Sequence, residues 1–168
     1  MLIRFASIRL ITIGFASFSA AAPAWAQPVT EPMDVEATVV AGCQVSATTM
    51  NFGSLFGLTG RPTTTSTISL LCTPNTDYEI SIDAGLHPAG TRRRRMYNPS
   101  TNRYMRYNIY RNANFTGQWD TRNNRKVSGN SGATGVASHT AYGQIRNLAP
   151  ANAGAGVFAD TVTVTIEF

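Results

Sequence analysis

The sequence predicts an all-β fold, a sandwich or a barrel built from short strands. Helical periodicity is nearly absent from its 168 residues, and short runs that alternate apolar and polar residues recur between turn-forming residues. The last nine residues show this pattern most clearly. One of their two faces carries the apolar side chains Val162, Val164, Ile166 and Phe168. Many short strands at this spacing are typical of sandwiches and barrels.

Residues 1–26 are typical of a signal peptide that is removed on export. Arg4 and Arg9 give a positive start, an apolar run follows, and Ala24-Trp25-Ala26 is a small-x-small cleavage site. The apolar run is shorter than the roughly 20 residues of a membrane-spanning helix. We therefore expect an exported mature chain that begins at Gln27 and is not inserted in a membrane.

Residues 27–40 precede the first cysteine and carry a clean strand pattern. Apolar side chains alternate with polar ones at Met33, Val35, Ala37 and Val39. Two prolines at the start of this segment suit an extended, flexible leader. Two interpretations remain open at this point. The segment is the first strand of its own domain, or it is a strand supplied to another molecule by β-strand addition.

Further strands are expected at regular intervals along the rest of the chain. Their predicted ranges are residues 44–52, 65–72, 78–82, 104–110, 136–145 and 160–168. The Gly-rich, polar residues 128–135 are expected to form a mobile hairpin loop, because they offer nothing to pack. Residues 151–156 are expected to be a second connection of small residues.

The mature chain contains two cysteines, Cys43 and Cys72. In an oxidising compartment an even pair indicates a disulfide. Closing a loop of about 30 residues would contribute on the order of 3.5 kcal/mol in the chain-entropy account. A zinc site would need more ligands, and the only histidines are His87 and His139. We therefore expect a disulfide and no metal.

Length and charge fit a single exported domain. Without the two arginines of the signal peptide, 12 basic and 9 acidic residues remain, a net charge of +3. Much of this excess comes from the four arginines at 92–95, so it does not indicate a general nucleic-acid-binding surface. Lysine occurs only at Lys126, whereas Thr, Asn, Gly and Ala are abundant. This composition favours exported β-proteins over cytosolic enzymes.

The residues that carry chemistry form no catalytic pattern. His139 follows Ser138, but no nucleophile elbow accompanies them, and a lone histidine on a strand is expected at the surface. Asp77, Glu79 and Asp83 lie close in sequence without forming a recognisable calcium loop. We therefore expect no enzyme activity and no cofactor.

Residues 92–110 interleave arginine with tyrosine and methionine, a combination that can bind single-stranded nucleic acid. Alternation instead places Tyr107 and Ile109 on a core-facing side and leaves the arginines in a solvated loop or on the outer face. Export also separates the protein from most nucleic acid. We expect no nucleic-acid partner, and binding of anionic surfaces or polysaccharide stays open.

An ordered set of segments resembles the spore coat protein U domain. Its opening is Val-Val-Ala-Gly-Cys-Gln-Val-Ser-Ala-Thr-Thr-Met-Asn-Phe-Gly at 39–53. The other segments are Leu71-Cys72-Thr73, Arg95-Met96, Tyr107-Asn-Ile-Tyr110, Trp119, Tyr142-Gly143-Gln144-Ile145 and residues 158–168. The set spans nearly all of the mature chain. The family includes secreted subunits of archaic chaperone–usher pili, the Csu-like pili.

The resemblance implies an immunoglobulin-like sandwich over residues 41–168 that lacks its final strand. A periplasmic chaperone would lend a strand during export, an outer-membrane usher would assemble the fibre, and the extension of the next subunit would replace the lent strand. On this chain the resemblance implies a disulfide between Cys43 and Cys72. It also implies one wall of the acceptor groove, contacted by the chaperone, at Val162, Val164, Ile166 and Phe168. Alternation then assigns the donor side chains to Met33, Val35, Ala37 and Val39.

The sequence therefore predicts a structural subunit of a surface fibre, exported through the periplasm, with a role in adhesion or biofilm formation. Its other partners would be identical or related subunits. The alternative is a self-complete secreted β-sandwich that serves as a coat or carbohydrate-binding protein. Two departures from the family pattern leave local loops open, namely the length of the arginine run at 92–95 and Asp120, which replaces the usual glycine after Trp119.

Overall fold

The computed structural model describes residues 30–56, 60–146 and 154–168. The predicted signal peptide, residues 1–26, lies outside the described residues, as do residues 27–29 of the extension and residues 151–153 of the expected connection. The chain divides into two units, Met1–Ala37 and Thr38–Phe168. Within the described ranges, no helix has the length and apolar character needed to cross a membrane.

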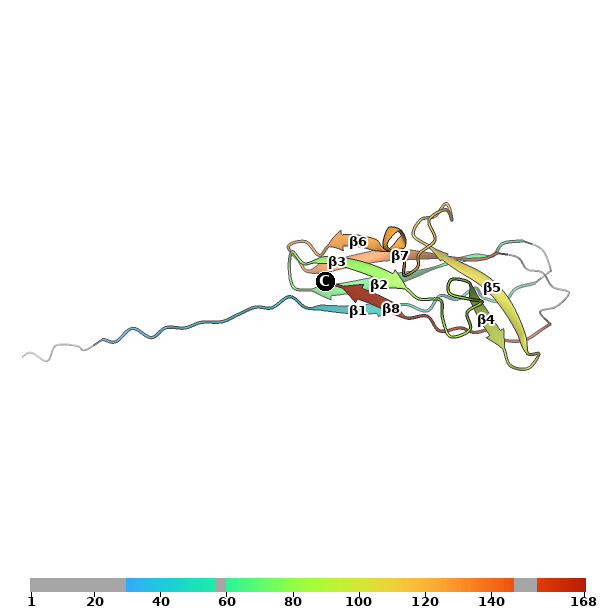
Figure 1. Cartoon of the computed structure of the whole chain (residues 1–168), viewed down its shortest axis with the longest axis horizontal. Helices are drawn as coiled ribbons and strands as arrows, with labels where there is room; N and C mark the ends of the chain where they lie inside the picture. The colour runs from blue at the N-terminus through green and yellow to red at the C-terminus, as the bar shows by residue number, and fades with distance from the viewer. Residues whose placement is uncertain (1–29, 57–59, 147–153) are drawn as a thin grey trace, which may run out of the picture. The chain divides into compact units, whose positions relative to one another are not determined.

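The second unit is built from two antiparallel sheets (Figure 1). The five-stranded sheet has the order β1 (Cys43–Ala47), β2 (Thr63–Cys72), β7 (Val136–Ile145), β5 (Arg103–Tyr110), β4 (Arg94–Asn98). The three-stranded sheet has the order β6 (Val127–Asn130), β3 (Asp77–Ile82), β8 (Val164–Glu167). A single-turn 3-10 helix, η1 (Asn123–Arg125), precedes β6. The predicted all-β sandwich is confirmed.

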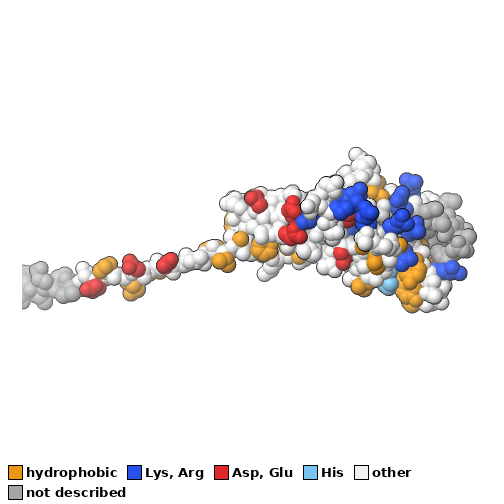
Figure 2. Space-filling view, viewed as in Figure 1, with side chains coloured by type: hydrophobic (Ala, Val, Ile, Leu, Met, Phe, Trp, Pro, Cys, Tyr) orange, Lys and Arg blue, Asp and Glu red, His pale blue; other side chains and the backbone are white. Residues whose placement is uncertain are grey.

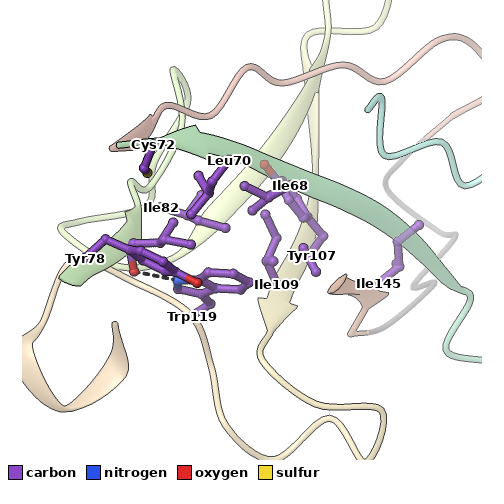
Figure 3. Packing of buried hydrophobic residues seen from close by; sticks show 11 residues of the cluster. Ile68, Leu70, Cys72, Tyr78, Ile82, Tyr107, Ile109, Trp119 and Ile145 are labelled. Atoms are coloured by element: carbon purple, nitrogen blue, oxygen red, sulfur yellow. Dashed lines mark hydrogen bonds between the residues drawn. The ribbon is translucent and has the colours of Figure 1, made fainter. Parts of the chain in front are cut away.

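The core lies between the two sheets and follows from alternation within the strands. In β2, Ser66, Ile68, Leu70 and Cys72 are buried, while the residues between them are exposed. Ile80 of β3 and Ile145 of β7 are fully buried. Burying such a side chain contributes about 1.5–3 kcal/mol. Figure 3 shows these apolar side chains converging from both layers.

Trp119 joins the two layers. Its side chain is 1% exposed, and its indole Nε1 donates a hydrogen bond to the carbonyl of Ile80 at 2.9 Å, the dashed line in Figure 3. Its backbone amide donates to the carbonyl of Ile109 in β5 at 2.8 Å. Trp119, in the loop that follows β5, thus connects the five-stranded sheet to the central strand of the three-stranded sheet.

Most predicted strands match the structure. The ranges 65–72, 78–82, 104–110 and 136–145 correspond to β2, β3, β5 and β7. The predicted strand at 44–52 is wrong beyond Ala47, because Asn51 and Gly53 form a turn in which the Asn51 side chain accepts the Gly53 amide. The predicted strand at 160–168 shortens to β8. Just before β8, the Thr163 carbonyl accepts a hydrogen bond from the Asp83 amide, and the Thr163 amide donates one to the Asp83 carboxylate.

The predicted strand at 33–40 is not formed in the isolated chain. No described strand pairs with these residues, and a strand needs a neighbouring edge to bond its backbone groups. They run without regular structure and are exposed.

The prediction of a mobile hairpin loop at 128–135 is wrong in two ways. Residues 127–130 form β6, whose partner is β3, so the connection to β7 crosses between the sheets. Ser131 within it is 2% exposed, and its hydroxyl donates to the Thr73 carbonyl and accepts from the Thr76 amide. The small residues there serve tight packing rather than mobility. A Cβ at Gly129 would collide with the ring of Tyr78.

The sequence predicts that the arginines at 92–95 are solvated, and this prediction is wrong for Arg94. Arg94 is 1% exposed and points between the sheets, because it is paired with Tyr107, an inward-facing residue of β5. Its guanidinium donates to the carbonyls of Ile82, Asp83 and Trp119 at 2.7–2.8 Å. The bonds to Ile82 and Trp119 are buried, so Arg94 supplies donors to carbonyls that water does not reach.

His139 also differs from the surface residue that was predicted. It is half-buried on the inner face of β7, opposite Ile68, and its Nε2 lies 2.8 Å from the Tyr78 hydroxyl. Burial lowers the pKa of this histidine, which favours the neutral ring. The residue is part of the packing between the layers.

Candidate functional site

The sandwich is open along one side, between β1 and β8. We call this opening the seam. Among the described strands, β1 ends the five-stranded sheet and pairs only with β2, while β8 ends the three-stranded sheet and pairs only with β3. The two strands contact each other and run in opposite directions (Figure 1). Within the described residues, each presents an edge of unpaired backbone groups to the seam.

On the β1 side, inward-facing residues are uncovered. Val45 is paired with Leu70 and Ala47 with Ile68, and residues directly opposite in an antiparallel pair share one face. Leu70 and Ile68 are each 2% exposed, so this face is the core face. Yet Val45 is 37% exposed, and Ala47 is also exposed. The core is therefore unfinished beside β1.

The β8 side shows the same incompleteness. Ile166 is paired with Ile80 and Val164 with Ile82, so both point toward the core. Val162, Val164 and Ile166 pack against the core cluster but are only partly buried, whereas the β3 partners of Val164 and Ile166 are fully buried. Phe168 is 59% exposed. These are the residues predicted to line an acceptor groove, and that role stays a prediction.

A disulfide fixes the start of β1. Cys43 and Cys72 are bonded, with their Cα atoms 4.0 Å apart, and they are paired in the β1–β2 register. The predicted disulfide is confirmed. It attaches the strand that borders the seam covalently to the end of β2, which is itself paired on both sides.

The segment that leads into β8 is held by Asp160. Its carboxylate accepts hydrogen bonds from the Tyr107 hydroxyl at 2.7 Å and the Leu86 amide at 3.0 Å, and its side chain is 1% exposed. Burial and this hydrogen bond raise the pKa of Tyr107. Just before it, Ala159 pairs with Tyr97 at the free edge of β4. The chain crosses from one sheet to the other at Asp160, so this wall of the seam is anchored.

The seam widens at one end into a hollow of about 1570 Å³. Residues 50–55, which follow β1, and residues 154–158, which precede β8, both line it. Its apolar lining includes Met50, Phe52 and Met105. A Cβ at Gly143 would come within 2.5 Å of the Met50 sulfur. Glycine at this position of β7 therefore leaves room for the side chains of Met50 and Phe52.

Seven arginines also line it, and we call the whole cavity the arginine hollow. They are Arg92, Arg93, Arg94, Arg106, Arg122, Arg125 and Arg146. Among the residues that line it, none is acidic. The sequence places three of these arginines, Arg92, Arg93 and Arg94, in one run, but it gives no signal that Arg122, Arg125 and Arg146 would join them.

The predicted donor side chains are all accessible. Met33, Val35 and Val39 are 84%, 88% and 81% exposed, and Ala37 is exposed as well. Such exposure is unusual for apolar side chains that alternate in phase with a strand. The donor role of this segment stays a prediction.

The other candidates from the sequence are not brought together. Glu79 bonds Lys126, Asp77 accepts from Asn130, and Asp83 accepts the amides of Gly85 and Thr163. Across residues 30–56, 60–146 and 154–168, no group of three or more His, Cys, Asp or Glu side chains could hold a metal ion.

A model of the Spore Coat Protein U domain matches residues 29–165 of this chain. Among solved structures, the chain is similar to the CsuC–CsuE chaperone–tip adhesion subunit pre-assembly complex from the archaic chaperone–usher Csu pili of Acinetobacter baumannii. The identity is 28% and the TM-score 0.61, over 78% of this chain and 41% of the neighbour. This chain thus spans about two fifths of the length of that neighbour. No curated protein matches.

Proposed function

Since the chain belongs to the spore coat protein U domain family, we propose that it is a structural subunit of a chaperone–usher fibre, assembled when the extension of one copy fills the seam of another. The family contains structural pilus subunits rather than enzymes. The observation that carries the proposal is the open seam, where core-facing side chains of two edge strands stay uncovered.

One added strand would pair the unpaired strand edges of the seam and cover its exposed core-facing side chains. Its backbone would bond the free edges of β1 and β8, and its alternate side chains would cover the unfinished core. Edges of this kind otherwise promote uncontrolled association, so a dedicated occupant is favoured. Val45 and Ala47 on one wall, with Val164 and Ile166 on the other, would contact the inserted side chains.

The extension has the features of such a strand. Residues 27–40, fully extended at about 3.3 Å per residue, would span roughly 45 Å. Four apolar side chains, at Met33, Val35, Ala37 and Val39, recur every second residue, which is the spacing of the side chains that an added strand places in such a groove. Burying them would contribute on the order of 6–10 kcal/mol before ordering costs.

Pairing between copies would be head-to-tail, because the donating segment and the accepting seam are different parts of the chain. Contacts of this kind propagate as a filament when they do not close into a ring. Before assembly, a periplasmic chaperone would cover the seam, since in the CsuC–CsuE pre-assembly complex a chaperone is bound to a pilus subunit. An outer-membrane usher would complete the pathway. The fibre would lie at the cell surface and serve adhesion or biofilm formation.

The alternative of a self-complete secreted sandwich is less well supported. It requires residues 27–40 to pair within their own domain, and no described strand pairs with their described part. In the structure Val45 and Ala47 are also uncovered, which a self-complete sandwich does not explain.

The test compares two matched changes in the extension of the full mature chain. Val35→Asn places an amide on the apolar face, whereas Thr38→Asn changes the polar face. We expect Val35→Asn to reduce polymerisation more than tenfold, since a loss of about 1.4 kcal/mol is already tenfold. Thr38→Asn should polymerise normally. Fibre length is measured by size-exclusion chromatography and electron microscopy after release from the chaperone.

Deleting residues 27–38 should abolish polymerisation while chaperone binding is retained, because the seam is intact. Unchanged polymerisation after this deletion would refute the proposed donor role. A stable monomer of the unaltered chain, without any chaperone, would favour the self-complete alternative.

A further inference from the structure

The arginine hollow carries positive charge that the second unit does not neutralise. Arg122 and Arg125 each form an ion pair with the carboxylate of Asp120. Arg92, Arg93 and Arg146 are exposed, as is Arg106, and within the described residues none of these four forms an ion pair with a carboxylate. Figure 2 shows basic side chains gathered over the region of η1 and β5.

A buried donor in the same place is also unsatisfied. Arg94 lines the hollow, and its Nη1 has no hydrogen-bond partner among the described residues, although its other nitrogens bond three carbonyls. A buried guanidinium nitrogen without a partner is costly. A carboxylate near this atom would remove that cost.

The acidic residues of residues 41–168 are already engaged. They are six in number, against twelve basic residues in the same range. Asp120, Glu79 and Glu167 are in ion pairs. Asp77, Asp83 and Asp160 accept hydrogen bonds from side chains or backbone amides. The second unit thus holds no spare carboxylate for its own hollow.

The remaining three acidic residues of the mature chain are all in the extension. Glu31, Asp34 and Glu36 are exposed, and no basic residue lies between positions 27 and 60. Figure 2 shows acidic side chains along the described part of the extension. One part of the chain is therefore purely acidic, and a different part offers unpaired arginines.

We propose that the arginine hollow binds the acidic side chains of the extension of a second copy, so that charge attraction selects and guides the strand that fills the seam. This inference rests on the proposed function. Apolar side chains of the extension would complete the core, while Asp34 and Glu36, on the opposite face of the same strand, would meet the arginines at the rim.

The spacing of the acidic residues suits this arrangement in either strand direction. From Glu31 to Glu36 the extended chain covers roughly 17 Å at about 3.3 Å per residue. The hollow continues the seam, with walls that follow β1 and precede β8. Whichever end of the extension lies over the hollow, an acidic residue lies within reach of arginine side chains, which are long and flexible.

The experiment measures initial rates of polymerisation of the full mature chain, released from its chaperone, at low and high salt. One variant neutralises the extension (Glu31→Gln, Asp34→Asn, Glu36→Gln). A second neutralises the rim of the hollow (Arg92→Gln, Arg93→Gln). The matched control removes the same charge outside the hollow (Arg61→Gln, Arg103→Gln), since neither of these exposed arginines lines it.

We expect the first two variants to slow polymerisation about tenfold at low salt, because steering by complementary charge accelerates association by that order. The difference should shrink as salt reduces the screening length to a few ångströms, about 3 Å at 1 M. The initial rate of the control variant should fall far less. Combining the first two variants should add little to either, since both remove the same attraction.

Three results would overturn the inference while the proposed function stands. In the first, Val35→Asn blocks polymerisation but the charge variants match the unaltered chain at every salt concentration. In the second, the control slows polymerisation as much as the hollow variant does, which assigns the effect to net charge. In the third, the hollow variant polymerises normally but is no longer retained on a polyuronate column that retains the unaltered chain, which assigns the hollow to an anionic glycan. If Val35→Asn polymerises normally, the proposed function itself fails.

Discussion

Arg94 shows how one side chain can connect two layers. Its guanidinium lies between the sheets and donates to carbonyls at the end of β3 and at Trp119. Burial lowers the pKa of Arg94, and the nearby Tyr107 and Asp120 oppose this shift. The charge is tolerated because the carbonyls replace the water that it lost.

Replacing Arg94 should therefore destabilise the fold strongly. Arg94→Met keeps much of the side-chain volume but removes three hydrogen bonds to carbonyls, two of them buried, and we expect a loss of about 3–5 kcal/mol in the free energy of unfolding. The neighbouring Arg93 is exposed, so Arg93→Met should change it by less than about 0.5 kcal/mol. Urea unfolding of both full-length variants measures the difference. Equal midpoints for the two would show that Arg94 has no such structural role.

The sequence did not indicate this role, and the reason is local. A run of four arginines is usually solvated, and nothing in the run distinguishes Arg94 from its neighbours. Its position became clear only from its register, opposite Tyr107 in β5. By contrast, the inward orientation of Tyr107 and Ile109 was predicted correctly, because alternation of apolar residues is visible without knowledge of the partner strand.

At the scale of elements, the same contrast explains which strands were predicted. β7 matches its predicted bounds, since it alternates along its whole length. β4 and β6 were missed. β4 begins within the arginine run, and β6 has the sequence Val-Ser-Gly-Asn, in which glycine is required because Tyr78 lies against it. Such strands are defined by a tertiary partner rather than by their own pattern.

The candidate site was predicted in part. The inward face of the last strand, the disulfide and the exposed alternation of the extension were all visible in the sequence. The arginine hollow was not, because Arg146 is remote from 92–95 in sequence and meets them only through the pairing of β4, β5 and β7. Neither was the exposure of Val45, which depends on the strand that β1 lacks.

The edge strand β1 offers a test that separates folding from assembly. Val45 faces the core but is 37% exposed in the isolated chain, so Val45→Asn should cost less than about 1 kcal/mol of its stability. Once a strand fills the seam, the new amide would be buried without a partner, at a cost of about 1–3 kcal/mol, and polymerisation should fall at least tenfold.

Ser46→Asn is the control for this change, because Ser46 lies on the outer face of the same strand. It should leave both unfolding and polymerisation unchanged. If Val45→Asn polymerises as well as Ser46→Asn does, the inserted strand does not pass along β1.

At the scale of the whole molecule, an unfinished core makes stability depend on the occupant of the seam. A ligand that binds only the folded chain stabilises it by about 2.7 kcal/mol at a hundred times its dissociation constant. A synthetic peptide of residues 27–40 should act in this way on the full chain. We expect its melting temperature to rise by roughly 10 °C at saturating peptide, given typical unfolding entropies.

Differential scanning calorimetry over a series of peptide concentrations measures this rise. A peptide that carries Val35→Asn and Val39→Asn is the control and should give little stabilisation. Equal effects of the two peptides would mean that the stabilisation does not come from apolar side chains that enter the seam.

The disulfide beside the seam has a mechanical consequence for a fibre held together by extensions. Tension along such a fibre would enter each subunit through its extension and arrive at Cys43, the first residue of β1. From there a covalent bond leads to Cys72 at the end of β2, which is hydrogen-bonded to strands on both sides. The pulling force is thus transferred past the weakly held edge strand to an interior strand of the five-stranded sheet. That strand would be loaded along its length, so its backbone hydrogen bonds resist together in shear rather than opening one after another.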